Sequence, residues 1–115
     1  MRYMMLVCVD EAMELELPAE EAARIGSEAQ AWVSEMEERG VRVQGQELAR
    51  VQDATTLRVR RGEVVVADGP FAETKEQIAG FDILECTDLD EAMEVAAKHP
   101  VARFGALELR PFAEE

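Results

Sequence analysis

The stretch that decides the fold is residues 4–9, which reads MMLVCV and is apolar throughout. A strand with one wet face alternates apolar and polar residues, whereas an uninterrupted apolar run is typical of a strand buried on both faces. Such a strand needs a layer of packing on each side. The rest of the sequence must therefore provide cover for two faces of one sheet.

A long amphipathic helix is predicted soon after this strand, over residues 18–39. Pro18 suits the first helical position, and Gly40 suits a left-handed stop after the last turn. Between them, apolar side chains recur at spacings of three and four and form one stripe: Ala22, Ile25, Ala29, Trp32 and Met36. The acidic segment 10–16, between strand and helix, is predicted to be a loop.

The middle of the chain predicts strands and a hairpin. Residues 41–48 alternate, with Val41, Val43 and Gly45 on a dry face and Arg42, Gln44 and Gln46 on a wet one. Two short strands, 55–60 and 64–67, are joined by Arg61-Gly62, which is typical of a hairpin. The T-x-x-Q spacing of residues 74–77 predicts one helical turn.

The last third predicts a strand, a helix and a final strand. Residues 78–86 form an apolar run, with Gly80 as a possible bulge position. Asp88 is an acidic cap for a second helix that ends at Pro100. The predicted stripe of this helix is Leu89, Ala92, Met93 and Ala96, and Leu107 and Leu109 share one face of a strand over residues 104–110.

Without the hairpin, the element order is βαββαβ, which predicts a ferredoxin-like α+β fold in a single domain, 1–115. Both helices of this fold cover the same face of an antiparallel sheet. The other face would then expose a large apolar patch, which is unusual for a monomer. We expect a homodimer that packs sheet to sheet; the rival is a monomer whose inserted hairpin folds over the open face.

The composition of the chain limits which partners it can bind and which cellular compartment we expect for it. The net charge of −13 opposes binding to nucleic acid and to anionic membranes, because both are polyanions. The apolar run near the N-terminus is too short to span a bilayer and lacks a cleavage site, so we expect a cytoplasmic protein. Cys8 and Cys86 lie in apolar runs, which favours reduced thiols over a bridge between adjacent strands. Without a Cys/His cluster or a phosphate-binding glycine loop, we expect neither metal nor cofactor.

Several motifs resemble the DGPF-domain branch of the YCII-related family. They are Asp68 to Glu76 (DGPFAETKE), Gly80-Phe81, Leu89 to Ala92 (LDEA), Glu108 to Pro111 (ELRP), Arg2 to Met4 (RYM) and Gly45 to Leu48 (GQEL). The resemblance implies a small bacterial cytoplasmic protein with a dimeric α+β barrel fold. Genes of this kind often lie beside extracytoplasmic-function sigma factors, so it also implies a regulatory partner of that class.

One departure from the wider family concerns catalysis. Its enzyme-like members carry a His on the first helix and an Asp just before a Pro that follows the second helix. Here residues 18–39 contain no His, and the residue before Pro100 is His99. This difference argues against transferring a His–Asp acid/base pair to this chain.

The DGPF motif supplies three candidate site residues. Asp68 is either a turn former, bonding to backbone N–H groups ahead of it, or a general base or ligand contact at a strand end. Phe71 is either an anchor that plugs the loop into the core or a stacking surface for a ligand. Glu73 most simply faces solvent, and its alternative is a ligand contact.

The remaining candidates lie elsewhere in the chain. His99 is the one side chain with an ordinary pKa near neutrality, so it is either an acid/base catalyst or a favourable group at a helix end. Arg42 and Gln44 could line a pocket against the DGPF loop. The basic residues Arg58, Arg60 and Arg61 either attract an anion or form a solvated hairpin surface.

Two functions follow from these residues. The first is a homodimeric binding or accessory module that holds a small organic molecule between helix and sheet, next to Asp68, Phe71 and Arg42. The second is a cofactor-free lyase or isomerase for a small acid, for example an aromatic one, with Asp68 or His99 as proton carrier and Arg42 as carboxylate clamp. A protein-interaction role through the acidic surface is a third hypothesis.

Overall fold

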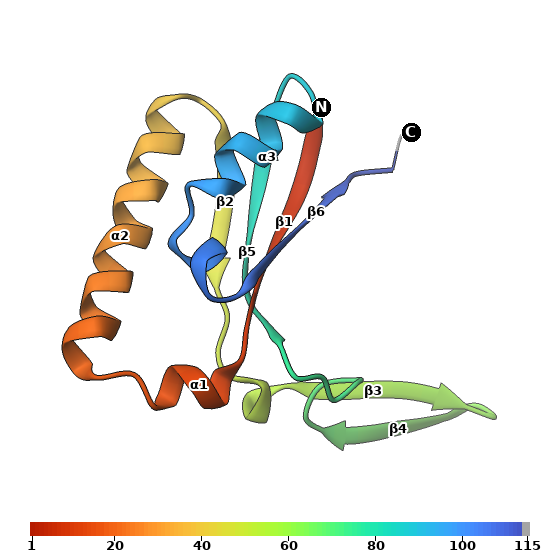
Figure 1. Cartoon of the computed structure of the whole chain (residues 1–115). Coiled ribbons are helices and arrows are strands. Elements are labelled where there is room, and N and C mark those ends of the chain that lie inside the picture. The colour runs from red at the N-terminus through yellow and green to blue at the C-terminus, as the bar shows by residue number, and fades with distance from the viewer. Residues whose placement is uncertain (114–115) are drawn as a thin grey trace.

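A four-stranded antiparallel sheet with helices on one side forms the body of the protein, in a computed structural model that describes residues 1–113 (Figure 1). The strands are β1 (Arg2–Val9), β2 (Arg42–Glu47), β3 (Thr55–Arg60), β4 (Glu63–Asp68), β5 (Gln77–Glu85) and β6 (Ala106–Pro111). The helices are α1 (Glu11–Leu15), α2 (Ala19–Glu38) and α3 (Leu89–Ala97), with short 3-10 turns at Val51–Asp53 and Pro100–Arg103.

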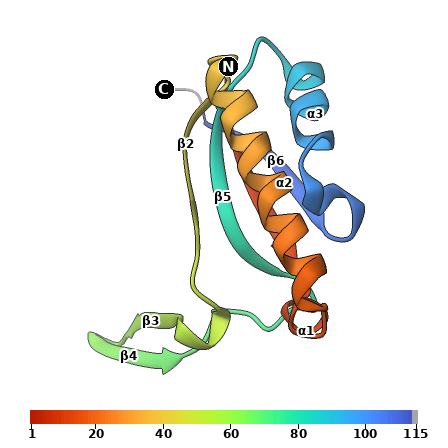
Figure 2. The same cartoon turned by 90° about the vertical axis from the view of Figure 1, so that its left-hand side faces the viewer.

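The strand order β2-β5-β1-β6 confirms the ferredoxin-like prediction, because it is the order that two βαβ units produce when their sheets merge. All pairings in this sheet are antiparallel. Figure 2 shows α2 and α3 on the same side of β5 and β2. Within residues 1–113, no helix covers the opposite face of the sheet.

The central strand β1 has two apolar faces that differ in burial. Tyr3, Met5, Val7 and Val9 are buried beneath the helices, whereas the alternate residues Met4, Leu6 and Cys8 are half-buried on the other face. The second face continues on β5, where Phe81 and Ile83 pair with Leu6 and Met4. We call this second face, with these two strands, the open face.

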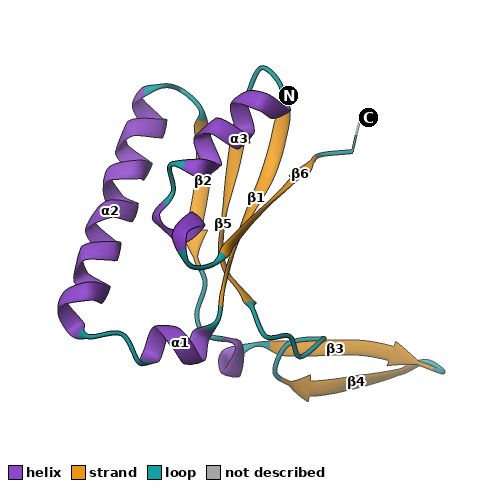
Figure 3. Cartoon of the chain, viewed as in Figure 1, coloured by secondary structure: helices purple, strands orange, loops and turns teal. Residues whose placement is uncertain are grey.

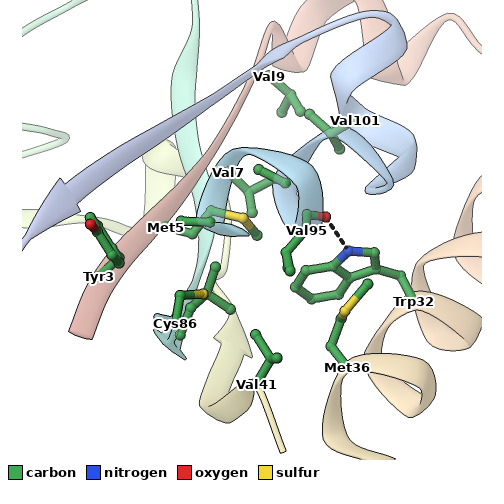
Figure 4. Close-up of a cluster of buried hydrophobic side chains, with 13 residues drawn as sticks. Tyr3, Met5, Val7, Val9, Trp32, Met36, Val41, Cys86, Val95 and Val101 are labelled. Carbon is green, nitrogen blue, oxygen red and sulfur yellow. Dashed lines mark hydrogen bonds between the residues drawn. The ribbon is translucent and has the colours of Figure 1, made fainter. Parts of the chain in front are cut away.

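The core lies between the sheet, α3 and the C-terminal half of α2 (Figure 4). Trp32 and Met36 of α2 are almost fully buried, and the indole Nε1 of Trp32 donates to the carbonyl of Val95 at 2.9 Å. This bond satisfies the polar atom of a buried Trp and ties α2 to α3. Truncating such a side chain typically costs about 3–5 kcal/mol.

Two local predictions about loops were wrong. The acidic segment after β1 contains α1, because Asp10 caps it by accepting bonds from the backbone N–H groups of Ala12 and Met13. The segment 74–77 forms no helical turn: Thr74 bonds to the Glu76 carbonyl, and Gln77 opens β5. In both places a short polar side chain competes for local backbone groups, and its spacing alone does not fix the outcome.

The alternation predicted for β2 was also wrong. The register shifts between Arg42 and Gln44, so that Arg42 and Gly45 both face the helices while Gln44 faces the other side. This bulge turns Arg42 inward, and its side chain is only 12% exposed. In α3 the stripe is rotated: Val95 is buried, whereas Leu89 and Met93 are each 48% exposed.

The β3–β4 hairpin is a separate two-stranded sheet that stands away from the body (Figure 3). Arg61 and Gly62 have φ values of 53° and 79°, which fits the two-residue turn that joins twisted strands. The radius of gyration of 16.1 Å exceeds the value of about 13 Å expected for a compact chain of this size, because the hairpin projects. It does not fold over the open face (Figures 1 and 2).

Candidate functional site: a cleft between α2 and the sheet

A cleft of about 680 Å³ lies between α2 and the helix-facing side of the sheet. Its apolar lining comes from β1, β5, α2 and the second 3-10 turn, and includes Val7, Val9, Ala79, Ala29, Val33 and Val101. Figure 4 shows Val7 and Val9 on β1, with Val101 beside Val9. The cleft therefore begins where the packed core ends.

Small residues on α2 leave this volume open. Trp32 and Met36 fill the space between the C-terminal half of α2 and the sheet, whereas the smaller residues Ala22, Gly26 and Ala29 nearer its N-terminus line the cleft. A Cβ placed on Gly26 would meet no atom within 4 Å. The apolar stripe predicted from the sequence therefore has two parts, one that packs and one that faces an open volume.

An ion-pair network of Arg42, Asp82 and Glu37 lies along the cleft. The Nε of Arg42 donates to Asp82 Oδ1 at 2.7 Å, and its Nη1 donates to Glu37 Oε2 at 2.8 Å. Glycine at position 45 leaves room for the Arg42–Asp82 ion pair, because a Cβ there would lie 2.2 Å from Asp82 Oδ1 and 2.5 Å from Arg42 Nη2. Burial raises the pKa of Asp82, and the neighbouring Arg42 only partly opposes this.

Asp82 keeps one oxygen free toward the cleft. The residue is 6% exposed, and within residues 1–113 only its Oδ1 accepts a hydrogen bond. No side-chain nitrogen or oxygen of the described residues is both fully enclosed and without a partner. Its Oδ2 therefore keeps some exposed surface, and the open volume that Asp82 lines is this cleft.

His99 presents a neutral donor to the same cleft. It is 8% exposed, and its ring packs edge-on against Trp32 with centroids 4.9 Å apart. Its Nδ1 accepts the backbone N–H of Val101 at 3.1 Å, which places the ring proton on Nε2 in the neutral form. Burial lowers the pKa of His99 to about 4, so it is uncharged near neutral pH. His99 lines the cleft, and within the described chain its Nε2 has no partner.

The structure separates the sequence-predicted site residues into two groups. Arg42 and His99 both line the cleft. Asp68, Phe71 and Glu73 are exposed at the base of the hairpin, and Gln44 is exposed beside the open face. The ligand-binding and catalytic roles of all six stay predictions.

The DGPF loop is held by its backbone. Gly69, with φ of 95°, donates its N–H to the Ala54 carbonyl at 2.8 Å and accepts a bond from the Thr56 hydroxyl at 2.8 Å. The Asp68 side chain makes no hydrogen bond to the described residues, and Phe71 is 79% exposed. Within this chain, Phe71 therefore does not anchor the loop in a core.

Sequence reasoning missed Asp82 and Gly45. The signal for Asp82 was present, since this carboxylate stands in the middle of the mostly apolar stretch 78–86, whose other acid, Glu85, is near its end. A charge in the middle of such a stretch is expected to have a partner or a function. The role of Gly45 depends on a cross-strand contact that no local pattern reveals.

These features define a class: a ferredoxin-like α+β protein with a partly polar cleft under its longest helix. The family model for the YCII-related domain matches residues 1–114. An uncharacterized protein of Rhizobium meliloti (strain 1021) is 37% identical, over 98% of this chain and 93% of its own length. The chain belongs to the YCII-related family.

Two absences within residues 1–113 concern membrane spans and metal sites. No helix there combines the length and the apolar character that a bilayer crossing requires. Within the same residues, no three His, Cys, Asp or Glu side chains come together as a metal site would need.

Proposed function

We propose that the protein binds a small organic molecule in the cleft between α2 and the sheet. The observation that carries this proposal is an open volume with an apolar floor, lined by two side chains, Asp82 and His99, that are more than nine-tenths buried and each have one polar atom without a hydrogen bond to residues 1–113. Burying a polar atom without a partner is unfavourable, so an occupant with matching groups would be stabilised there. The cleft volume of about 680 Å³ falls in the range found for small-molecule binding sites.

The enzymatic alternative with Arg42 as a carboxylate clamp is less well supported. Two of the guanidinium nitrogens already donate to Asp82 and Glu37. A substrate acid would have to compete with both carboxylates for them. We therefore regard Arg42 as a positioning residue that orients Asp82.

The test fills the cleft from the side of α2. In Ala29→Leu the larger side chain occupies the cleft, whereas Ala31→Leu places the same side chain on the exposed surface of the same helix. A fragment library is screened against the wild-type protein by thermal shift, and hits are titrated against both variants. We expect Ala29→Leu to weaken binding of the hits about tenfold or more and Ala31→Leu to leave it unchanged.

Two results would overturn the proposal. One is a screen in which no fragment raises the melting temperature of a well-folded protein. The other is a set of hits whose affinities are the same in the wild type and in Ala29→Leu.

We infer in addition that a second copy of the chain covers the open face. Support comes from the half-buried Met4, Leu6 and Ile83 on that face and from the hairpin. One hairpin side carries four apolar residues that are each at least half exposed: Leu57, Val59, Val64 and Val66. A two-stranded ribbon is marginal on its own, so packing against a partner would stabilise it.

A further inference from the structure

The charges around the cleft are strongly unbalanced. Its lining includes four carboxylates, Glu14, Glu37, Glu47 and Asp82, against the single guanidinium of Arg42. His99 adds no charge near neutral pH, because its pKa is lowered to about 4. A ligand entering this cleft therefore meets an excess of negative charge inside an already acidic protein.

Two of these carboxylates lie close together on the floor of the cleft. In the β2–β5 ladder, Gly45 pairs with Asp82 and Glu47 pairs with Gly80, so the two acids are diagonal neighbours on the same face of the sheet. Diagonal neighbours are about 7–8 Å apart, within joint reach of one bound group. Gly80, opposite Glu47, leaves bare backbone beside the two acids, whereas the space over Gly45 is taken by Asp82 Oδ1 and Arg42 Nη2.

The arrangement keeps these acids available to a ligand. Within residues 1–113, Glu47 and Glu14 form no ion pair, and Asp82 has one oxygen free toward the cleft. The pKa of Glu14 is raised by burial and by the negative charges of Glu11 and Glu47, which outweigh Arg50. Glu47 and Glu14 are thus near enough to repel each other, and a cation bound at Glu47 would reduce that repulsion.

Resting on the proposed function, we propose that the ligand of this cleft is a small organic amine, whose ammonium group sits beside Gly80 and bonds to Glu47 and to Asp82 Oδ2, the oxygen that Arg42 does not bind. Its apolar part lies against Val7, Ala29 and Val33, which line the same cleft. An ammonium group carries up to three donors, which suits two carboxylates that approach from adjacent strands. The Nε2–H of His99 offers a donor to an acceptor atom elsewhere on the ligand.

The experiment compares three probes of similar size that differ in charge: 2-phenylethylamine, 2-phenylethanol and phenylacetate. Affinity is measured at pH 7 by amide chemical-shift titration of the intact protein. We expect the amine to bind about tenfold or more tightly than the alcohol, because a hydrogen bond to a charged group contributes more than a neutral one. Phenylacetate is expected to bind most weakly.

Charge-removing variants locate the ammonium group. Glu47→Gln removes one of the two charges without leaving a cation unpaired, and it should weaken amine binding several-fold while leaving the alcohol unchanged. Asp82→Asn should do the same, and it is the riskier variant because it removes one of the two carboxylates that pair with Arg42. Glu73→Gln makes the same change on an exposed loop outside the cleft and should have no effect.

The inference is overturned if the alcohol or the carboxylate binds as well as the amine, or if Glu47→Gln binds the amine as the wild type does. It is also overturned if the amine moves no cleft amide at millimolar concentration. In each case the proposed function stands or falls separately, because it depends on whether fragments of any chemistry lose affinity in Ala29→Leu.

Discussion

At the residue scale, His99 combines two tasks on its two ring nitrogens. Nδ1 caps the turn that follows α3, by accepting the N–H of Val101, and Nε2 has no hydrogen bond to residues 1–113 on a side chain that lines the cleft. Its ring also packs on Trp32, so it links the core to the cleft. A buried imidazole whose acceptor nitrogen already binds a backbone N–H is held in its neutral form. The stability of the folded protein is therefore expected to depend on pH.

The sign of that dependence follows from the direction of the shift. His99 has a pKa of about 4 in the folded protein and about 6.5 when unfolded, so the unfolded chain takes up a proton first as the pH falls. The stability due to neutral His99 is complete above about pH 6.5 and is lost between there and about pH 4. A shift of this size corresponds to about 3 kcal/mol.

His99→Asn isolates this effect, because its Oδ1 can replace Nδ1 as the cap and it does not titrate. We expect the free-energy advantage of the wild type over this variant to shrink on acidification from pH 7 to pH 4.5, as measured by denaturant unfolding. The comparison is needed because the raised pKa of Asp82 acts in the opposite direction. A difference that stays constant with pH would contradict a depressed His99 pKa.

At the element scale, the hairpin carries four of its large apolar residues on one side. Leu57 pairs with Val66 and Val59 with Val64, which places these four together, whereas Val65 pairs with Arg58 on the other side. The hairpin side that contains Val66 is therefore the side expected to meet a partner. Neighbouring positions on one strand provide a matched pair of variants.

Val66→Lys should weaken the proposed dimer and Val65→Lys should not, because only the first introduces a charge into the apolar side. Light scattering during gel filtration measures the result, and a dimer has twice the chain mass of 12.8 kDa. A lysine on an exposed strand leaves the protomer folded, which circular dichroism checks. Equal masses for the two variants would argue against a hairpin contact.

Sequence patterns predicted the elements well where a single rule dominated. The uninterrupted run at β1, the long stripe of α2 and the Arg61-Gly62 turn each led to the observed element. They failed where a bulge or a local cap changed the direction of a side chain, as at Arg42 and α1. The cleft could be predicted only in outline, because Asp82, Gly45 and His99 converge through strand register and helix packing.

At the scale of the whole molecule, the two faces of the sheet are used differently. The helix-facing side is packed at one end and hollow at the other, where it forms the cleft. In our proposal, a second copy of the chain covers the open face and packs against the projecting hairpin. A dimer formed through those surfaces would leave α2 and its cleft on the outside of the assembly, accessible to small molecules.

The central claim is that the cleft under α2 is a ligand site, and the most direct measurement is an amide chemical-shift map of the protein with fragments that bind. We predict that shifts gather at Ala29, Val33, Gly45, Ala79 and Val101, which line the cleft on four different elements. Shifts that gather instead at the DGPF loop, around Asp68 and Phe71, would contradict the account.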